Sequence, residues 1–372
     1  MAIARTDTSL LGRWWWTVDH AMLSAVGVLF GFGYVLAMAA EPAAAHRLGD
    51  PRYHLLAKQM VFLAAGFALM LVISMLSPRQ VRRLALAGGI VALLLTAATL
   101  AVGMEVLGAR RWIRFPGFVM QPSEFLKPCF AVVTAWLLAE RRRNPRFPGG
   151  AIALVLYAFI MVLLKEQPDV GMAVVITAVL FVQMFVDGLS LTLVAVSLLG
   201  MAAMAVAAYL SFHHVRMRVA EFLHPHGPDA YQIQISLKAF GNGGLLGRGL
   251  GEGRMKDLLP DAQADFIFAV AGEEMGLVFT ALIPLVYAFI VLRGIWRLLA
   301  ETEPFTVLAG TGLIASFGLQ AFVNMASAMK MIPTKGMTLP FLSYGGSSAI
   351  AAALEVGMLL ALSRRRPRGE LA

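Results

Sequence analysis

Cysteine and charged side chains are scarce in this sequence. Of its 372 residues, 14% are charged and one, Cys129, is a cysteine. Soluble domains carry about 25% charged residues, so this composition excludes an ordinary soluble domain. A single cysteine also excludes an intrachain disulfide. The 22 acidic residues are outnumbered by 31 lysines and arginines, which gives a net charge of +9. In so apolar a chain, membrane orientation and anionic lipid explain that excess better than nucleic acid, and we expect no nucleic-acid partner.

Long apolar runs replace the missing charge. The sequence is 59% hydrophobic, with a mean hydropathy of +0.74. Runs of about 20 residues, enough to cross a ~30 Å hydrocarbon core as helix, recur along its length. We therefore predict an all-α polytopic membrane protein that forms one domain, residues 1–372. The ten predicted spans are 21–40, 53–76, 84–102, 123–140, 150–164, 170–186, 189–210, 266–292, 305–326 and 345–363.

An even number of spans places both termini on one side of the membrane. Loops on the side of the termini hold 15 Lys and Arg, against 8 in the opposite short loops. The positive-inside rule then predicts cytoplasmic termini and an extracytoplasmic loop at residues 211–265. The first apolar run is longer than a signal-peptide core and is followed by more spans, so we expect a retained helix.

The loop 211–265 is the one long polar segment. Within it, Tyr231 to Phe240 has an amphipathic pattern that puts Ile233, Leu237 and Phe240 on one helical stripe. We expect this helix to lie in the membrane interface or over the mouth of the bundle. The glycines that follow match neither the dinucleotide fingerprint nor the P-loop, which argues against nucleotide binding. The loop histidines at 213, 214, 224 and 226 lack metal-site spacing.

Asp265 ends this loop, directly before an apolar run. An aspartate there is a preferred helix N-cap, and it is equally suited to act as a catalytic base at the membrane surface. Further along the same run, Glu273 and Glu274 point about 100° apart on a helix. We therefore expect them to have separate partners, with a structural role.

Two further motifs place charged residues at the ends of predicted spans. Glu124 and Lys127, spaced by three, share a helix face on which they can pair; this pair is either a neutralising salt bridge or part of a polar cavity. Asp169 falls in a short outer turn, where it is either a functional carboxylate or a turn residue before Gly171.

The segment from Pro333 to Ser348 is polar and broken by Gly and Pro. Such backbone near a membrane lines a cavity or is buried by protein. Its Lys335 and Ser343 offer donors to phosphate or sugar, and a plain re-entrant turn is the alternative. Several outer cations close to the membrane either snorkel to headgroups or form a phosphate receptor. They are Arg110, Arg111, Arg114, Lys165, Lys330 and Lys335.

Five motifs together resemble the SEDS family, the shape, elongation, division and sporulation proteins. They are GARRWI from Gly108, QPSEFLK from Gln121, QPDVG from Gln167, LPDAQADFIFAVAGEEMG from Leu259 and PTKGMTLPFLSYGGSS from Pro333. The loop YQIQISLKAFGNGGLLGRGLGEG is more similar to the division member of the family than to the elongation member. In place of the family's common His-Thr before the aspartate, this chain has Gln263 and Ala264.

The resemblance implies a peptidoglycan glycosyltransferase of the bacterial inner membrane at the division septum. Such an enzyme polymerises lipid II on the outer face, with a class B penicillin-binding protein as transpeptidase and other divisome proteins as partners. The family's essential aspartate corresponds to Asp265. Its basic and polar positions correspond to Arg111, Glu124, Lys127 and Lys335, with a looser match at Lys58; Asp169 and Ser343 lie in the remaining motifs.

The α-linked donor and β-linked product of that reaction require inversion by direct displacement. A base must then remove the acceptor proton while positive charge stabilises the departing pyrophosphate. We assign Asp265 as base, and Arg111, Lys127 and Lys335 to the pyrophosphate. A divalent cation, Mg²⁺ or Mn²⁺, is left open as a further pyrophosphate ligand, with no covalent cofactor. The alternatives are a lipid II flippase, an elongation-type polymerase and a division scaffold.

Overall fold

The computed structural model describes residues 9–48, 54–106, 109–115, 118–211, 216–217, 219–220, 228–333 and 336–365. Lys335 and the four loop histidines lie outside these ranges, and so does Gly108 of the first motif.

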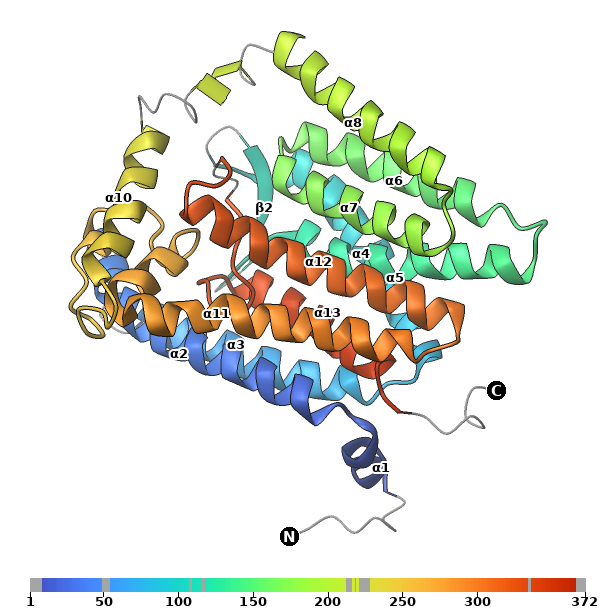
Figure 1. Cartoon of the computed structure of the whole chain (residues 1–372), viewed down its shortest axis with the longest axis horizontal. Helices are drawn as coiled ribbons and strands as arrows, with labels where there is room; N and C mark the ends of the chain where they lie inside the picture. The colour runs from blue at the N-terminus through green and yellow to red at the C-terminus, as the bar shows by residue number, and fades with distance from the viewer. Residues whose placement is uncertain are drawn as a thin grey trace.

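Each of the ten predicted spans coincides with a helix (Figure 1). These helices are α2 (His20–Leu48), α3 (His54–Ser74), α4 (Pro78–Val102), α5 (Pro122–Arg143), α6 (Gly149–Glu166), α7 (Val170–Val186), α8 (Leu191–Ser211), α11 (Ile267–Leu299), α12 (Pro304–Ala328) and α13 (Gly346–Leu362). Among the described residues, six helices are long and apolar enough to cross a membrane, namely α2, α3, α4, α6, α11 and α12; α7, α8 and α13 are shorter apolar helices. The chain is therefore a multi-pass helical membrane protein.

Three helices form the centre of the bundle. Most residues of α5, α12 and α13 are buried, and the most extensive helix pairs are α13 with α3, α4 with α5, and α12 with α5. By contrast, α8 lies at the outer edge beyond α6 and α7 (Figure 1), with Leu191 and Leu199 at least 70% exposed. Large apolar side chains on the outside of such a bundle face lipid rather than water.

Local capping determines where helices α4 and α12 begin. Ser77 forms a capping box with Gln80, and Pro78 occupies the first turn of α4. Glu303 accepts from the Thr306 backbone N–H at the start of α12, again followed by a proline. A capped N–H and a proline, which has no N–H to satisfy, both favour a helix start at these positions.

Several short elements escaped the sequence prediction. A helix α1 (Leu10–Thr17) precedes the first span. Three strands, β1 (Met104–Val106), β2 (Ala109–Phe115) and β3 (Phe118–Met120), form an antiparallel sheet in the order β1-β2-β3 between α4 and α5. β1 and β3 have three residues each, too few to be recognised from alternation, and in β2 the sequence ARRWIRF does not alternate regularly between apolar and polar residues.

The amphipathic prediction for residues 231–240 was partly wrong. Helix α10 (Pro228–Gly243) packs on α11, as expected for a helix over the bundle, but Leu237 is 41% exposed. The buried face contains Ile233, Ser236 and Ala239. Ser236 Oγ donates to the Ala328 carbonyl at 2.6 Å. A polar residue thus occupies the buried stripe because it has a backbone partner there.

The glycine-rich loop after α10 is attached to α11 by the two glutamates. Glu273 accepts from the Met255 N–H at 2.8 Å. Glu274 accepts from the Gly251 N–H at 2.9 Å and pairs with Lys256 at 2.6 Å. The prediction of separate, structural partners is confirmed. The 3₁₀ turn η1 (Met255–Asp257) lies in this loop.

Candidate active site

A cavity of about 710 Å³ lies at the end of the bundle where α4 ends and α5 begins. Its walls come from α3, the sheet, the first turn of α5, the turn before α11 and the segment 336–348. One wall is apolar and aromatic, formed by Phe62, Trp112, Phe115, Phe118 and Val119. The charged residues that line it are Lys58, Arg114, Glu124, Asp261 and Asp265. An apolar wall facing a few charges suits an amphiphile with a charged headgroup.

Asp265 is positioned by its backbone. Its N–H donates to the Asp261 carbonyl at 3.1 Å, and its carbonyl accepts from Asn324 Nδ2 at 3.1 Å. The same amide donates to the Met337 carbonyl at 2.6 Å, which ties the turn before α11 to the segment 336–348. The main chain of Asp265 is therefore fixed from two directions.

The cap interpretation of Asp265 was wrong. Helix α11 begins at Ile267, its N-cap position is Phe266, and no side chain caps it. Within the described part of the chain, the Asp265 carboxylate has no side-chain hydrogen bond or ion pair. It is only partly exposed and it lines the cavity. A carboxylate without a structural partner is free to accept a proton from a bound molecule.

Electrostatics make Asp265 more basic than an ordinary aspartate. Desolvation by the surrounding protein, and secondly the neighbouring charge of Asp261, raise the pKa of Asp265 to about 6. Both effects disfavour the ionised form. A base whose pKa approaches the working pH transfers protons efficiently, so this environment suits general-base chemistry near neutral pH.

The segment 336–345 lies directly against the carboxylate. A Cβ built on Gly336 would lie 3.5 Å from Asp265 Oδ2, and Gly336 has φ +60°. Ser343, buried and outside the cavity lining, donates from Oγ to the Ala264 carbonyl at 2.6 Å and accepts from the Leu339 N–H at 2.7 Å. The Tyr344 N–H donates to the Gln263 carbonyl at 2.7 Å. Ser343 therefore positions the backbone next to Asp265 rather than contacting the cavity.

The predicted pairing of Glu124 with Lys127 is confirmed. The two side chains are 2.7 Å apart, with Glu124 on the cavity and Lys127 behind it, 2% exposed. Lys127 also donates to Gln320 Oε1. The amide of Gln320 donates to the Thr338 carbonyl at 3.0 Å. The charge of Lys127 is thus neutralised inside a polar network that connects α5, α12 and the segment 336–348.

Arg111 and Asp169 lie together behind the cavity wall. Arg111 donates from Nε to the Gln167 carbonyl at 2.8 Å and approaches Asp169 to 4.0 Å. Asp169 caps α7 by accepting from the Met172 N–H at 3.1 Å. Burial raises the pKa of Asp169, and Arg111 partly opposes this effect. Neither residue lines the cavity, but Asp169 Oδ2 accepts at 3.2 Å from Nε2 of Gln121, which does line it.

Asp261 is the charged residue of the cavity that the sequence reasoning missed. It is exposed and adopts a positive φ of 54°, an uncommon conformation for a non-glycine residue. The spacing of four between Asp261 and Asp265 in PDAQAD was the available signal. Lys58 lies on α3 and lines the cavity. Lys335 lies outside the described residues.

Comparisons with known proteins agree on one family. A family model of cell cycle proteins, covering FtsW, RodA and SpoVE, matches residues 20–368. A probable peptidoglycan glycosyltransferase FtsW of Caulobacter vibrioides is 43% identical over 98% of this chain and 94% of its own length. The corresponding protein of Geobacter metallireducens is 35% identical, covering 93% and 95%.

Solved structures give the same result. One is a chain from work on the structural coordination of polymerization and crosslinking by a peptidoglycan synthase complex. It has 29% identity and a TM-score of 0.78, covering 93% of this chain and 97% of that one. The rod shape determining protein RodA of Thermus thermophilus has 28% identity and a TM-score of 0.67, covering 93% and 96%.

Proposed function

This chain belongs to the cell cycle protein family of FtsW, RodA and SpoVE, and from that premise we propose how its cavity works. The protein is a peptidoglycan glycosyltransferase associated with cell division. We propose that its substrate is lipid II, whose sugar pyrophosphate occupies the charged part of the cavity. The prenyl chain leaves along the aromatic wall formed by β2, β3 and α3. This placement requires the cavity to face the outer side of the membrane, with both termini and the opposite end of the bundle cytoplasmic.

In the proposed reaction, the carboxylate of Asp265 removes the proton from the acceptor hydroxyl. The acceptor oxygen forms a bond to the anomeric carbon of the donor as the bond from that carbon to the pyrophosphate breaks, which inverts the configuration. The proton passes to Asp265, and the prenyl pyrophosphate leaves with the electron pair. The observation that carries this proposal is a carboxylate that has a pKa of about 6 and no side-chain partner among the described residues, in one cavity with Lys58 and Arg114.

The cations divide into two groups by their surroundings. Lys58 and Arg114 line the cavity and are the candidates for holding the pyrophosphate. Lys335 joins them in the proposal because it precedes Gly336, which lies against Asp265. Arg111 and Lys127 already have protein partners. We assign these two, with Glu124, Asp169 and Ser343, to positioning the cavity walls.

A divalent cation fits the donors in the cavity. The charge of Asp261 raises the pKa of Asp265, so the two carboxylates, which both line the cavity, interact electrostatically. Carboxylate and phosphate oxygens are the ligands that Mg²⁺ and Mn²⁺ prefer, although the described residues contain no cluster of three acidic, His or Cys side chains. When bound, such an ion would be held by Asp261 and would neutralise pyrophosphate charge, which leaves the Asp265 carboxylate to accept the proton.

The proposed partner is a class B penicillin-binding protein transpeptidase, acting with other divisome membrane proteins at the septum. The structural similarity to a chain of a complex that coordinates polymerization and crosslinking supports this pairing. The similarity to FtsW proteins over nearly the whole chain favours division over elongation, and the RodA-type role is the second choice.

Polymerisation of labelled lipid II in detergent tests the proposal. The purified protein, together with its transpeptidase partner, is expected to form glycan chains; a flippase or a scaffold would form none. Asp265→Asn keeps the shape of the side chain but removes its basicity, and it should lower the rate by at least ~10²-fold. The matched control is Glu252→Gln, which changes an exposed acid outside the cavity lining. Normal polymerisation by Asp265→Asn would show that the base is elsewhere.

A further inference from the structure

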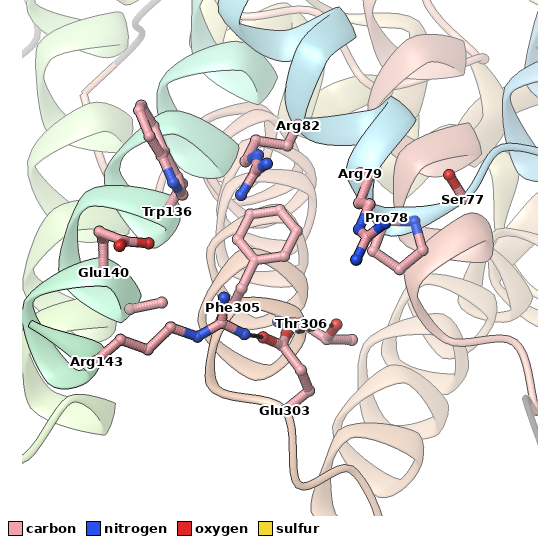
Figure 2. A pocket seen from close by; sticks show the side chains of 11 residues that line it. Ser77, Pro78, Arg79, Arg82, Trp136, Glu140, Arg143, Glu303, Phe305 and Thr306 are labelled. Atoms are coloured by element: carbon pink, nitrogen blue, oxygen red, sulfur yellow. Dashed lines mark hydrogen bonds and ion pairs between the residues drawn. The ribbon is translucent and has the colours of Figure 1, made fainter. Parts of the chain in front are cut away.

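A second polar pocket lies at the opposite end of the bundle (Figure 2). Its volume is about 260 Å³, and it lies between the first turn of α4, the last turns of α5 and the first turn of α12. Helix α4 runs from this pocket to the strand β1 beside the Asp265 cavity. Its 25 residues span about 37 Å at 1.5 Å per residue, which is the thickness of a hydrocarbon core with part of the headgroup region. The two sites therefore face opposite leaflets.

Positive charge in this pocket is not fully compensated. Arg143 pairs with Glu303 at 2.9 Å. In the described part of the chain, Arg79 and Arg82 have no ion-pair partner. The guanidinium of Arg82 lies 5.6 Å from the centre of the Trp136 ring, so its charge is held over an aromatic face. The pocket is lined by three arginines and two glutamates, Glu140 and Glu303, and this excess of positive charge attracts an anion.

The inner part of the pocket is aromatic rather than polar. Trp136 lies seven residues before Arg143 on α5, so it is about 10 Å deeper along the helix axis. Phe305, which is buried, projects toward the space between α4 and α5 in Figure 2. A charged mouth above an aromatic floor matches an amphiphile better than a fully hydrated anion.

An exposed apolar strip continues from the pocket along α4. Leu86 and Ile90 follow Arg82 at spacings of four and eight, which places them on the same helix face. Leu86 is 40% exposed and Ile90 is 54% exposed. An acyl chain that leaves the pocket can therefore lie along α4 within the membrane.

From these features we propose that the pocket binds an anionic phospholipid of the leaflet opposite the Asp265 cavity, with its phosphate on Arg79 and Arg82. The glycerol backbone below the phosphate rests on Trp136, and an acyl chain lies along Leu86 and Ile90. Basic pockets between transmembrane helices are established sites for anionic headgroups. A volume slightly below the ~300 Å³ of the smallest drug-sized sites suits a phosphate headgroup rather than a larger cofactor. This assignment does not depend on the reaction proposed above.

Native mass spectrometry of the purified full chain tests the proposal. Delipidated protein is titrated with phosphatidylglycerol, with cardiolipin and with phosphatidylcholine. The anionic lipids should bind at least tenfold more tightly than phosphatidylcholine. Arg79→Gln with Arg82→Gln should weaken anionic binding roughly 25-fold, because each basic side chain near anionic lipid contributes about fivefold. Arg83→Gln is the matched control, since Arg83 lies on the same turn but outside the pocket lining, and it should change binding less than twofold.

Glu140→Gln gives a test that misfolding cannot imitate. Glu140 lines the pocket, and its side chain has no ion-pair partner among the described residues. Removing its charge should tighten anionic lipid binding several-fold. Equal binding of phosphatidylcholine, equal losses in Arg83→Gln and the double variant, or weaker binding in Glu140→Gln would each overturn the proposal. Competition with sn-glycerol 3-phosphate identifies the source of the phosphate. If this soluble ester displaces the lipid at the concentrations at which the lipid itself saturates the pocket, the pocket binds a soluble phosphate ester and the lipid proposal is refuted.

Discussion

Replacing Asp265 with asparagine should stabilise the protein while it abolishes polymerisation. In the folded state the pKa of Asp265 is about 6, against an ordinary value of 3.8. The difference of 2.2, at 1.36 kcal/mol per pKa unit, means that ionised Asp265 destabilises the fold by up to about 3 kcal/mol above pH 6. Partial exposure of the side chain makes that figure an upper bound. Asparagine carries no charge and avoids this cost.

The size of the effect changes with pH in a defined window. Because the folded-state pKa is raised for an acid, wild-type stability is lost as pH rises from about 4 to about 6. The advantage of Asp265→Asn should therefore be full at pH 7.5, fall through pH 6 to 4, and vanish below pH 4. In thermal unfolding followed by intrinsic fluorescence, it should appear at pH 7.5 as a rise of a few degrees in melting temperature.

A control variant and the pH dependence make this prediction decisive. Glu252→Gln removes an exposed acid outside the cavity, so its melting temperature should match the wild type at pH 7.5. If structural partners held the Asp265 carboxylate, replacing it would instead lower the melting temperature. A melting temperature for Asp265→Asn that is lower than the wild type at pH 7.5, or a gain that persists at pH 4, would refute the reasoning from desolvation.

Three further changes test other parts of the structure. Asp261→Asn removes the like charge beside the catalytic carboxylate, so the acidic limb of the pH–rate profile should move to lower pH by less than about one unit; no movement, or movement upward, would contradict it. Glu124→Gln leaves Lys127 buried without its partner and should lower the free energy of unfolding by about 3–5 kcal/mol. Adding Lys127→Met should recover most of that loss in denaturant titration, and failure to recover it would argue against the pair. Gly247→Ala places a Cβ 2.2 Å from a carbonyl of α11 at φ +82° and should sharply reduce thermal stability; Gly251→Ala, with similar φ and open space around it, is the milder control.

The helices could be predicted because the apolar run that identifies each one lies within its own sequence. Apolar runs of about 20 residues identify spans without knowledge of their neighbours. The pairing of Glu124 with Lys127 was equally local, since residues three apart on a helix are adjacent in space. The separate partners of Glu273 and Glu274 followed from the 100° between consecutive helical positions.

What escaped prediction depends on contacts between distant segments. Arg111 is joined to a turn 56 residues away, and no periodicity records that contact. Leu237 fits the apolar stripe of its helix, yet the buried face is the one that carries Ser236, because the Ala328 carbonyl is there to accept its hydrogen bond. Asp265 looked like a cap because α11 begins nearby, but the helix starts one residue later than expected. A shift of one residue decides whether a carboxylate binds its own backbone or faces a cavity.

The absence of a side-chain partner for Asp265 in the described chain also matters for medicinal chemistry. An inhibitor with a basic amine would meet a carboxylate that pairs with no cation among the described residues. The compartment around it, about 710 Å³, lies within the range that accommodates drug-sized molecules, and its aromatic side offers surface for a hydrophobic scaffold. An inhibitor would therefore need only a basic group that pairs with Asp265 and a short hydrophobic segment, without reproducing an entire lipid-linked sugar.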